Sequence, residues 1–244
     1  MSKRRRRRND KQRRHQRPAP TRRRLALGVG LTISATLAAG GTAQATDFTV
    51  DSLGDEDDDN VGTGGCHTAV NTCTLRAAIE EANANSGPDN ILFDSSLSGT
   101  ITLVNGGALL VTGATDIQGP GAGQLSVSGN DAYRVFLVEQ ATVGNAVSIS
   151  DLTLTNGESP GGGGAIYNSN ANLTVSDVVV TDSYAPLRGG GVGSSFVAPS
   201  LTIERSTLSG NSTSTGGFNK GGGAIYAANE LFLADSTIAG NTSQ

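Results

Sequence analysis

Charged residues occupy one fixed place of a repeated segment in the second half of the chain. Asp151, Asp177, Arg205 and Asp235 each stand at the fifth position of an eleven-residue unit, so we expect them to stack on one outward edge. An edge of this kind could bind a ligand, and with calcium a basic residue there could take a proton from a uronic ring. Neutralisation of an acidic ladder by arginine is the simpler interpretation, because catalysis needs more converging groups. We therefore assign no catalytic residue.

A second acidic set lies near residue 55, in a glycine-rich stretch. Asp55, Asp57 and Asp59 could supply oxygen ligands to calcium. The stretch lacks the glycine and the final glutamate of an EF-hand loop, and an acidic run is commonly only solvated. A calcium site and a solvated loop both stay open, and no other cofactor is expected.

Cys66 and Cys73 are the only cysteines, with six residues between them. A zinc site needs four ligands, and these two thiols together with His67 supply only three. In an exported chain the default state of such a pair is a disulfide. We therefore predict a Cys66–Cys73 disulfide.

Export itself is predicted from the amino-terminal residues. Residues 1–24 hold 13 of the 18 lysines and arginines, and an apolar stretch over 25–39 and the small-x-small pattern Ala43-Gln44-Ala45 follow. This order is typical of a secretory signal peptide, here residues 1–45, and predicts a secreted or cell-surface bacterial protein. The arginines at 22–24 also admit the twin-arginine route. No later segment has the roughly 18 apolar residues that a transmembrane helix needs.

Removal of residues 1–45 changes the net charge of the chain from −4 to −16, because five basic and 21 acidic residues remain. A nucleic acid is an unfavourable partner for such a surface. Divalent cations, cationic surfaces and neutral glycans stay open as partners.

The repeated unit predicts the architecture. Its four copies begin at Val147, Leu173, Leu201 and Leu231, and each has aliphatic residues at the first, third and eighth positions. That pattern is typical of two short strands joined by a corner. A unit this short must stack on its neighbours to bury its apolar face. The sequence thus predicts an all-β solenoid, a parallel β-helix, over residues 90–244.

A short helix is expected before the solenoid, within an amino-terminal region over residues 46–89. Thr74 can cap it, and its apolar face consists of Leu75, Ala78, Ile79 and Ala82. Arg76, Glu80 and Glu81 are expected to point outward. The helix would cover the open end of the first coil, which would otherwise invite edge-to-edge association.

These residues also carry a resemblance to a known family. The segment Cys73-Thr74-Leu75-Arg76-Ala77-Ala78-Ile79 resembles the CSLREA signature, with Ala77 where that family has glutamate. The GGAIY segments at 163–167 and 222–226 are similar to the GGAI repeats of chlamydial polymorphic outer membrane proteins. The resemblance covers residues 46–244 and implies a right-handed parallel β-helix that is secreted or anchored at the surface, usually without an assigned activity.

Together these features favour an exported β-helix scaffold that binds a glycan or another component of a cell surface or matrix, as in adhesion. The alternative is a polysaccharide-active enzyme that uses the acidic edge, with calcium. The fourth unit ends three residues before Gln244, and no residue pattern there predicts a cap for the last apolar layer. We therefore expect end-to-end association or a further carboxy-terminal segment.

Overall fold

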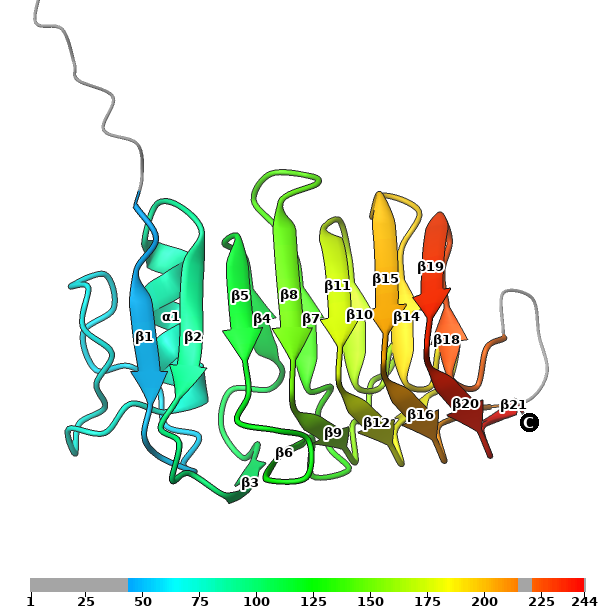
Figure 1. The fold of residues 1–244 in the computed structure, drawn as a ribbon, viewed down its shortest axis with the longest axis horizontal. Helices are drawn as coiled ribbons and strands as arrows, with labels where there is room; N and C mark the ends of the chain where they lie inside the picture. The colour runs from blue at the N-terminus through cyan, green and yellow to red at the C-terminus, as the bar shows by residue number, and fades with distance from the viewer. Residues whose placement is uncertain (1–43, 215–220, 244) are drawn as a thin grey trace, which may run out of the picture. The chain divides into compact units, whose positions relative to one another are not determined.

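The computed structural model describes residues 44–214 and 221–243. The predicted signal peptide, residues 1–45, thus lies outside the described residues except for its last two positions. The described residues fold as a right-handed parallel β-helix with one short helix, α1, at its amino-terminal end, as the sequence predicts (Figure 1).

The strands of successive coils form stacked parallel sheets in the described residues. The β8 sheet holds β1 (Asp47–Val50), β2 (Asp89–Phe93), β5 (Thr115–Gln118), β8 (Ala146–Ser150), β11 (Asn172–Ser176), β15 (Ser200–Glu204) and β19 (Glu230–Ala234). The β9 sheet holds β3 (Gly99–Thr102), β6 (Leu125–Ser128), β9 (Thr153–Thr155), β12 (Val179–Thr181), β16 (Thr207–Ser209) and β20 (Thr237–Ala239).

Two further sheets complete the coils. The β10 sheet holds β4 (Leu109–Val111), β7 (Phe136–Val138), β10 (Ile166–Asn168), β14 (Val192–Ser194) and β18 (Ile225–Tyr226). A short sheet of β13 (Tyr184–Ala185), β17 (Ser212–Thr213) and β21 (Thr242–Ser243) lies at a corner of the later coils. The strand pairs of the described residues are parallel, so each coil presents the same faces as its neighbour.

The register of the repeat is confirmed residue by residue. Leu173 pairs with Val147 on one side and with Leu201 on the other, and Leu201 pairs in turn with Leu231. The third and eighth aliphatics align in the same way. Since alternate residues of a strand point to opposite faces, the aligned aliphatics fill the interior, where those of the inner coils are buried.

A polar ladder runs through the interior corner at the eleventh position of the unit. The backbone N–H of Ser183 donates to Oδ1 of Asn211 at 3.1 Å, and the N–H of Asn211 donates to Oδ1 of Asn241 at 3.0 Å. Asn211 is fully buried, and its Nδ2 donates to the Val180 carbonyl at 2.9 Å. The side chains thus satisfy backbone groups that the corner would leave unpaired.

Helix α1 (Leu75–Ala84) covers the first coil and contacts β1, β2 and β4 (Figure 1). Its predicted cap is confirmed, because the Thr74 side chain accepts a hydrogen bond from the N–H of Ala77 at 3.0 Å. The predicted apolar face is confirmed too, since all four of its residues are buried. No helix in the described part of the chain is long and apolar enough to cross a membrane.

The prediction that the polar face of α1 points outward is wrong for Arg76 and Glu81, which are 6% and 1% exposed. The loop before the helix folds back over this face. Glu81 accepts hydrogen bonds from the N–H groups of Gly62 and Gly64 at 2.8 and 2.9 Å. Glu80 accepts one from the N–H of Asp58 at 2.8 Å. The side chains of Glu80 and Glu81 thus hold the acidic loop through the backbone N–H groups of the loop.

Cys66 and Cys73 form the predicted disulfide, with their Cα atoms 5.2 Å apart. The bridge joins the acidic loop to the residue directly before the helix cap Thr74. Such a link restricts the loop in the unfolded chain and favours its ordered position over α1.

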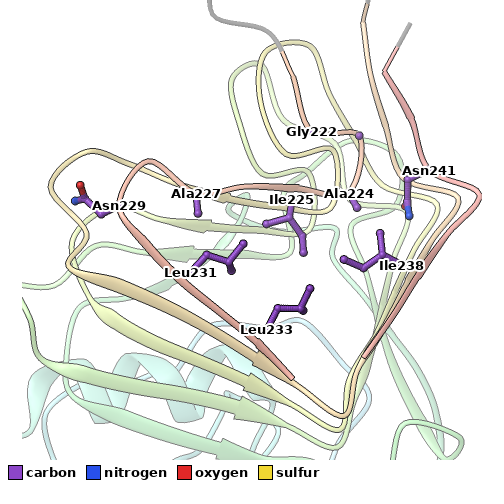
Figure 2. Close-up of a pocket in the computed structure, with 10 residues that line it drawn as sticks. Gly222, Ala224, Ile225, Ala227, Asn229, Leu231, Leu233, Ile238 and Asn241 are labelled. Atoms are coloured by element: carbon purple, nitrogen blue, oxygen red, sulfur yellow. The ribbon is translucent and has the colours of Figure 1, made fainter. Parts of the chain in front are cut away.

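At the other end the last coil is open in the described structure. Leu231, Leu233 and Ile238 continue the interior rows but are 42%, 46% and 45% exposed. Figure 2 shows them pointing with Ile225 into one apolar hollow at this end. The expected end-to-end association would cover this apolar layer. That association stays a prediction.

Candidate functional site

The four fifth-position residues lie at the corner between the β8 sheet and the β9 sheet. Asp151, Asp177, Arg205 and Asp235 all adopt positive φ angles, of 57°, 57°, 47° and 49°. Among residues other than glycine, aspartate is one of the few that adopt this left-handed conformation readily. The shape of the corner thus accounts for the three aspartates without any ligand.

Arg205 contacts two acidic groups, of which Asp177 is its expected neighbour in the stack and Glu204 is the preceding residue. Its Nη2 is 2.8 Å from Oδ2 of Asp177 in the preceding coil, and its Nη1 is 2.9 Å from Oε2 of Glu204. The hydrogen bonds that Arg205 donates to Asp177 lower the pKa of the Asp177 carboxyl. The pair is about half exposed, so it contributes little to stability and neutralises the acidic ladder locally. Its role as a binding site stays a prediction.

The three aspartates predicted as calcium ligands face different partners. Oδ1 of Asp55 accepts a hydrogen bond from Nε of Arg76 at 2.8 Å, and its Oδ2 accepts bonds from the N–H groups of Val104 and Asn105 at 2.7 and 2.8 Å. Its side chain is only 1% exposed. Asp57 is 65% exposed and 3.8 Å from the same arginine. Asp55 therefore has a structural role, because it links Arg76 of α1 to the backbone at Val104 and Asn105.

Asp59 belongs instead to a small group with Asp58 and His67, whose ligand atoms lie within 4.8 Å of one another. Nδ1 of His67 is 2.6 Å from Oδ1 of Asp59, and Oδ2 of Asp58 accepts the His67 N–H at 2.9 Å. Calcium takes six to eight oxygen ligands, so this group alone is an incomplete calcium site. Calcium binding therefore stays a prediction.

A groove that the sequence patterns do not indicate lies on the outward face of the β10 sheet. One outward row crosses this sheet, from Leu110 through Leu137, Tyr167 and Gly193 to Tyr226. Leu110 is 43% exposed, and Leu137 and both tyrosines are half-buried. The row is apolar and partly accessible, and the neighbouring positions in β4, β7 and β10 point into the core.

Two arginines lie over this row. The guanidinium carbon of Arg134 is 5.1 Å from the centre of the Tyr167 ring, and that of Arg188 is 4.8 Å from the centre of the Tyr226 ring. Arg188 also lies 5.5 Å from the ring of Phe196. A cation at this distance from an aromatic ring is attracted by the ring, which fixes the guanidinium in place.

Arg134 is held further by the backbone. Its Nε donates to the Gly163 carbonyl at 2.8 Å, and its Nη2 donates to the Gly162 carbonyl at 2.9 Å. Burial lowers the pKa of this guanidinium. No carboxylate of the described residues lies within 4.0 Å of it.

The resulting arginine–tyrosine groove has a volume of about 460 Å³. We define it by Arg134, Leu137, Tyr167, Leu187 and Arg188, and Glu139 and Ser169 add polar groups to its lining. Pockets of this size hold small organic ligands, such as one or two sugar rings. The groove offers an apolar floor with hydrogen-bond donors on its rim.

No protein-family model matches the chain, and the curated proteins and the solved structures likewise yield no match. The resemblance to CSLREA proteins therefore stays a prediction. The groove could have been found in the sequence only by aligning the two GGAIY segments, since these place Tyr167 and Tyr226 on the same row.

Proposed function

We propose that the chain is an exported β-helix scaffold whose arginine–tyrosine groove binds a glycan of a cell surface or extracellular matrix. Two features support export: the pattern of the first 45 residues and the disulfide, which is stable in oxidising compartments. A solenoid supports a binding role, because it presents an extended and regular surface.

The observation that carries the proposal is the chemistry of the groove. A sugar ring has apolar C–H faces and a rim of hydroxyl groups. Half-buried Leu137 and Tyr167 offer an apolar floor for such a face, and the arginine side chains offer donors for hydroxyl oxygens. Tyrosine and tryptophan, whose rings also carry a polar group, are common at interfaces that are apolar on one side and in contact with water on the other.

Binding is a better match than hydrolysis for this groove. A glycoside hydrolase uses a pair of carboxylates on the two sides of the scissile bond. Among the residues that line the groove, Glu139 supplies a single carboxylate. The alternative of a polysaccharide-active enzyme at the acidic edge remains a prediction that the same experiment tests.

The experiment measures binding and turnover together. The purified full chain is incubated with a panel of immobilised neutral and acidic glycans, with and without calcium, and both bound protein and released sugar are measured. We expect retention on at least one glycan without release of sugar. Turnover of any glycan would contradict the scaffold proposal and favour the enzyme.

A matched pair of variants locates the binding surface. Tyr167→Ala removes the ring that lines the groove, and Phe232→Ala removes an exposed ring from the β8 sheet. We expect Tyr167→Ala to weaken retention at least about fivefold and Phe232→Ala to leave it unchanged. Equal effects of the two variants would place the binding elsewhere.

A further inference from the structure

We propose that the ligand of the arginine–tyrosine groove is an acidic polysaccharide, with a uronate carboxylate bound by Arg134. This inference rests on the proposed function and adds the chemical class of the glycan. Three observations support it. Arg134 is partly buried and has no carboxylate partner among the described residues, Arg76 and Arg205 do have such partners, and the arginine–tyrosine pair occurs twice.

Arg134 is a partly desolvated cation that lacks a carboxylate among the described residues. Carbonyl oxygens occupy its Nε and one N–H of its Nη2, which leaves its Nη1 and the other Nη2 hydrogen for a ligand. A guanidinium out of water without a counterion is unfavourable, so an incoming anion gains more there than at an exposed site. A carboxylate matches the planar geometry of the remaining donors.

The absence of a protein carboxylate is notable because acidic residues outnumber basic ones by 21 to five in residues 46–244. Two other arginines of the described chain have such partners: Arg76 contacts Asp55, and Arg205 contacts Asp177 and Glu204. Arg134 differs from these two arginines, because its partners are two carbonyl oxygens and the Tyr167 ring.

The overall charge of −16 opposes an anionic ligand only at long range. At physiological ionic strength, interactions between exposed charges are screened beyond about 8 Å, so contacts within the groove decide the affinity. A nucleic acid carries a phosphate about every 3.4 Å per strand and would be repelled along its whole length. A polysaccharide with at most one carboxylate per sugar has a lower charge density than duplex DNA, which carries one charge per about 1.7 Å of its axis.

The arginine–tyrosine pair occurs twice, which indicates a repeating ligand. Arg134 lies over Tyr167 and Arg188 over Tyr226, and these tyrosines belong to β10 and β18, with β14 between them. Neighbouring strands are about 4.8 Å apart, so the two pairs are separated by about 10 Å along the solenoid. This spacing is close to the length of two pyranose rings, and a polymer could engage both pairs.

The test compares oligogalacturonates with the same oligomers after full methyl esterification, by calorimetry with the full chain. The ester keeps the rings and removes the charge, so no change to the protein is needed. We expect binding of the acid form and at least about a tenfold loss on esterification, as for a charge-assisted contact. Binding of the acid with equal affinity for the ester would overturn this inference and leave the proposed function intact.

Protein variants supply the second arm. Arg134→Gln and Arg188→Gln each remove a cation from the groove, and Arg205→Gln removes one from the acidic corner as the matched control. We expect at least about a tenfold loss of affinity for Arg134→Gln, a loss for Arg188→Gln, and none for the control. Equal losses in all three would mean that overall charge, not the groove, governs binding, and would overturn the inference.

Three further outcomes are informative. Should Arg134→Gln not fold, as judged by circular dichroism, Arg188→Gln and the ester comparison still decide the question. Retention of sulfated glycans alone would overturn the uronate assignment while keeping an anionic ligand. No retention on any glycan would contradict the proposed function itself.

Discussion

Arg134 and Tyr167 meet in the structure because one coil of the solenoid brings them together: the guanidinium carbon lies 5.1 Å from the centre of the ring. Arg188 and Tyr226 repeat this relationship further along the same sheet. The coils between them differ in length, since the repeated units start 26, 28 and 30 residues apart. The strands of the β8 sheet remain in register despite these different lengths.

The buried pair of Asp55 and Arg76 is predicted to be essential for holding helix α1 and the acidic loop on the first coils. Asp55→Asn leaves Arg76, whose side chain is 7% exposed, without its main partner. We expect the free energy of unfolding to fall by about 3–5 kcal/mol, because breaking a buried pair leaves an uncompensated charge. Denaturant unfolding measures this loss. Asp57→Asn is the matched control, because Asp57 is 65% exposed, and a loss of similar size there would refute the account of the cap.

The pair of Asp177 and Arg205 is predicted to change the pH dependence of folding stability at low pH only. Arg205 lowers the pKa of Asp177 in the folded chain. The pair therefore stabilises the fold above the unfolded pKa, about 3.9, and this contribution is lost as the pH falls through the folded value. Carbon NMR titration of the carboxyl group should show a pKa that rises in Arg205→Gln. An unchanged pKa in that variant would show that Arg205 is not the cause.

Equivalent leucines in two coils are predicted to differ in their effect on stability. Leu201 is fully buried and Leu231, its partner in the next coil, is 42% exposed. We expect Leu201→Ala to cost about 2–5 kcal/mol and Leu231→Ala less than half as much. Thermal unfolding at several protein concentrations provides the measurement.

The same pair of variants tests the expected end-to-end association. If two copies cover each other's open ends, the cost of Leu231→Ala rises with protein concentration while that of Leu201→Ala does not. A cost for Leu231→Ala that is independent of concentration, with a monomeric chain in sedimentation, would exclude association through this end.

Most of the fold could be predicted because its determinants are local. The aliphatics at positions one, three and eight alternate with polar residues, so they define two strands and the corner between them, and the structure places Leu173 and Leu201 in the predicted row. Thr74 and the apolar face of α1 are likewise set by neighbours three or four residues away.

The polar contacts depend on distant segments and were harder to predict. Glu81 appears on a helical wheel as a surface residue, yet the backbone of Gly62 and Gly64 folds over it. The fifth position of the unit looked like a site because it is charged, whereas its aspartates also suit a corner with positive φ. The groove depends on which arginine meets which ring one coil later, and the spacing along the chain does not show this.

The most direct test of the glycan-binding proposal is amide hydrogen exchange of the full chain with and without a bound oligogalacturonate. We predict slower exchange in the segments that form the groove, around residues 134–139, 161–169 and 187–193, and no change at the corner that carries Asp151, Asp177 and Arg205. Protection confined to that corner, with none in the groove, would contradict the account.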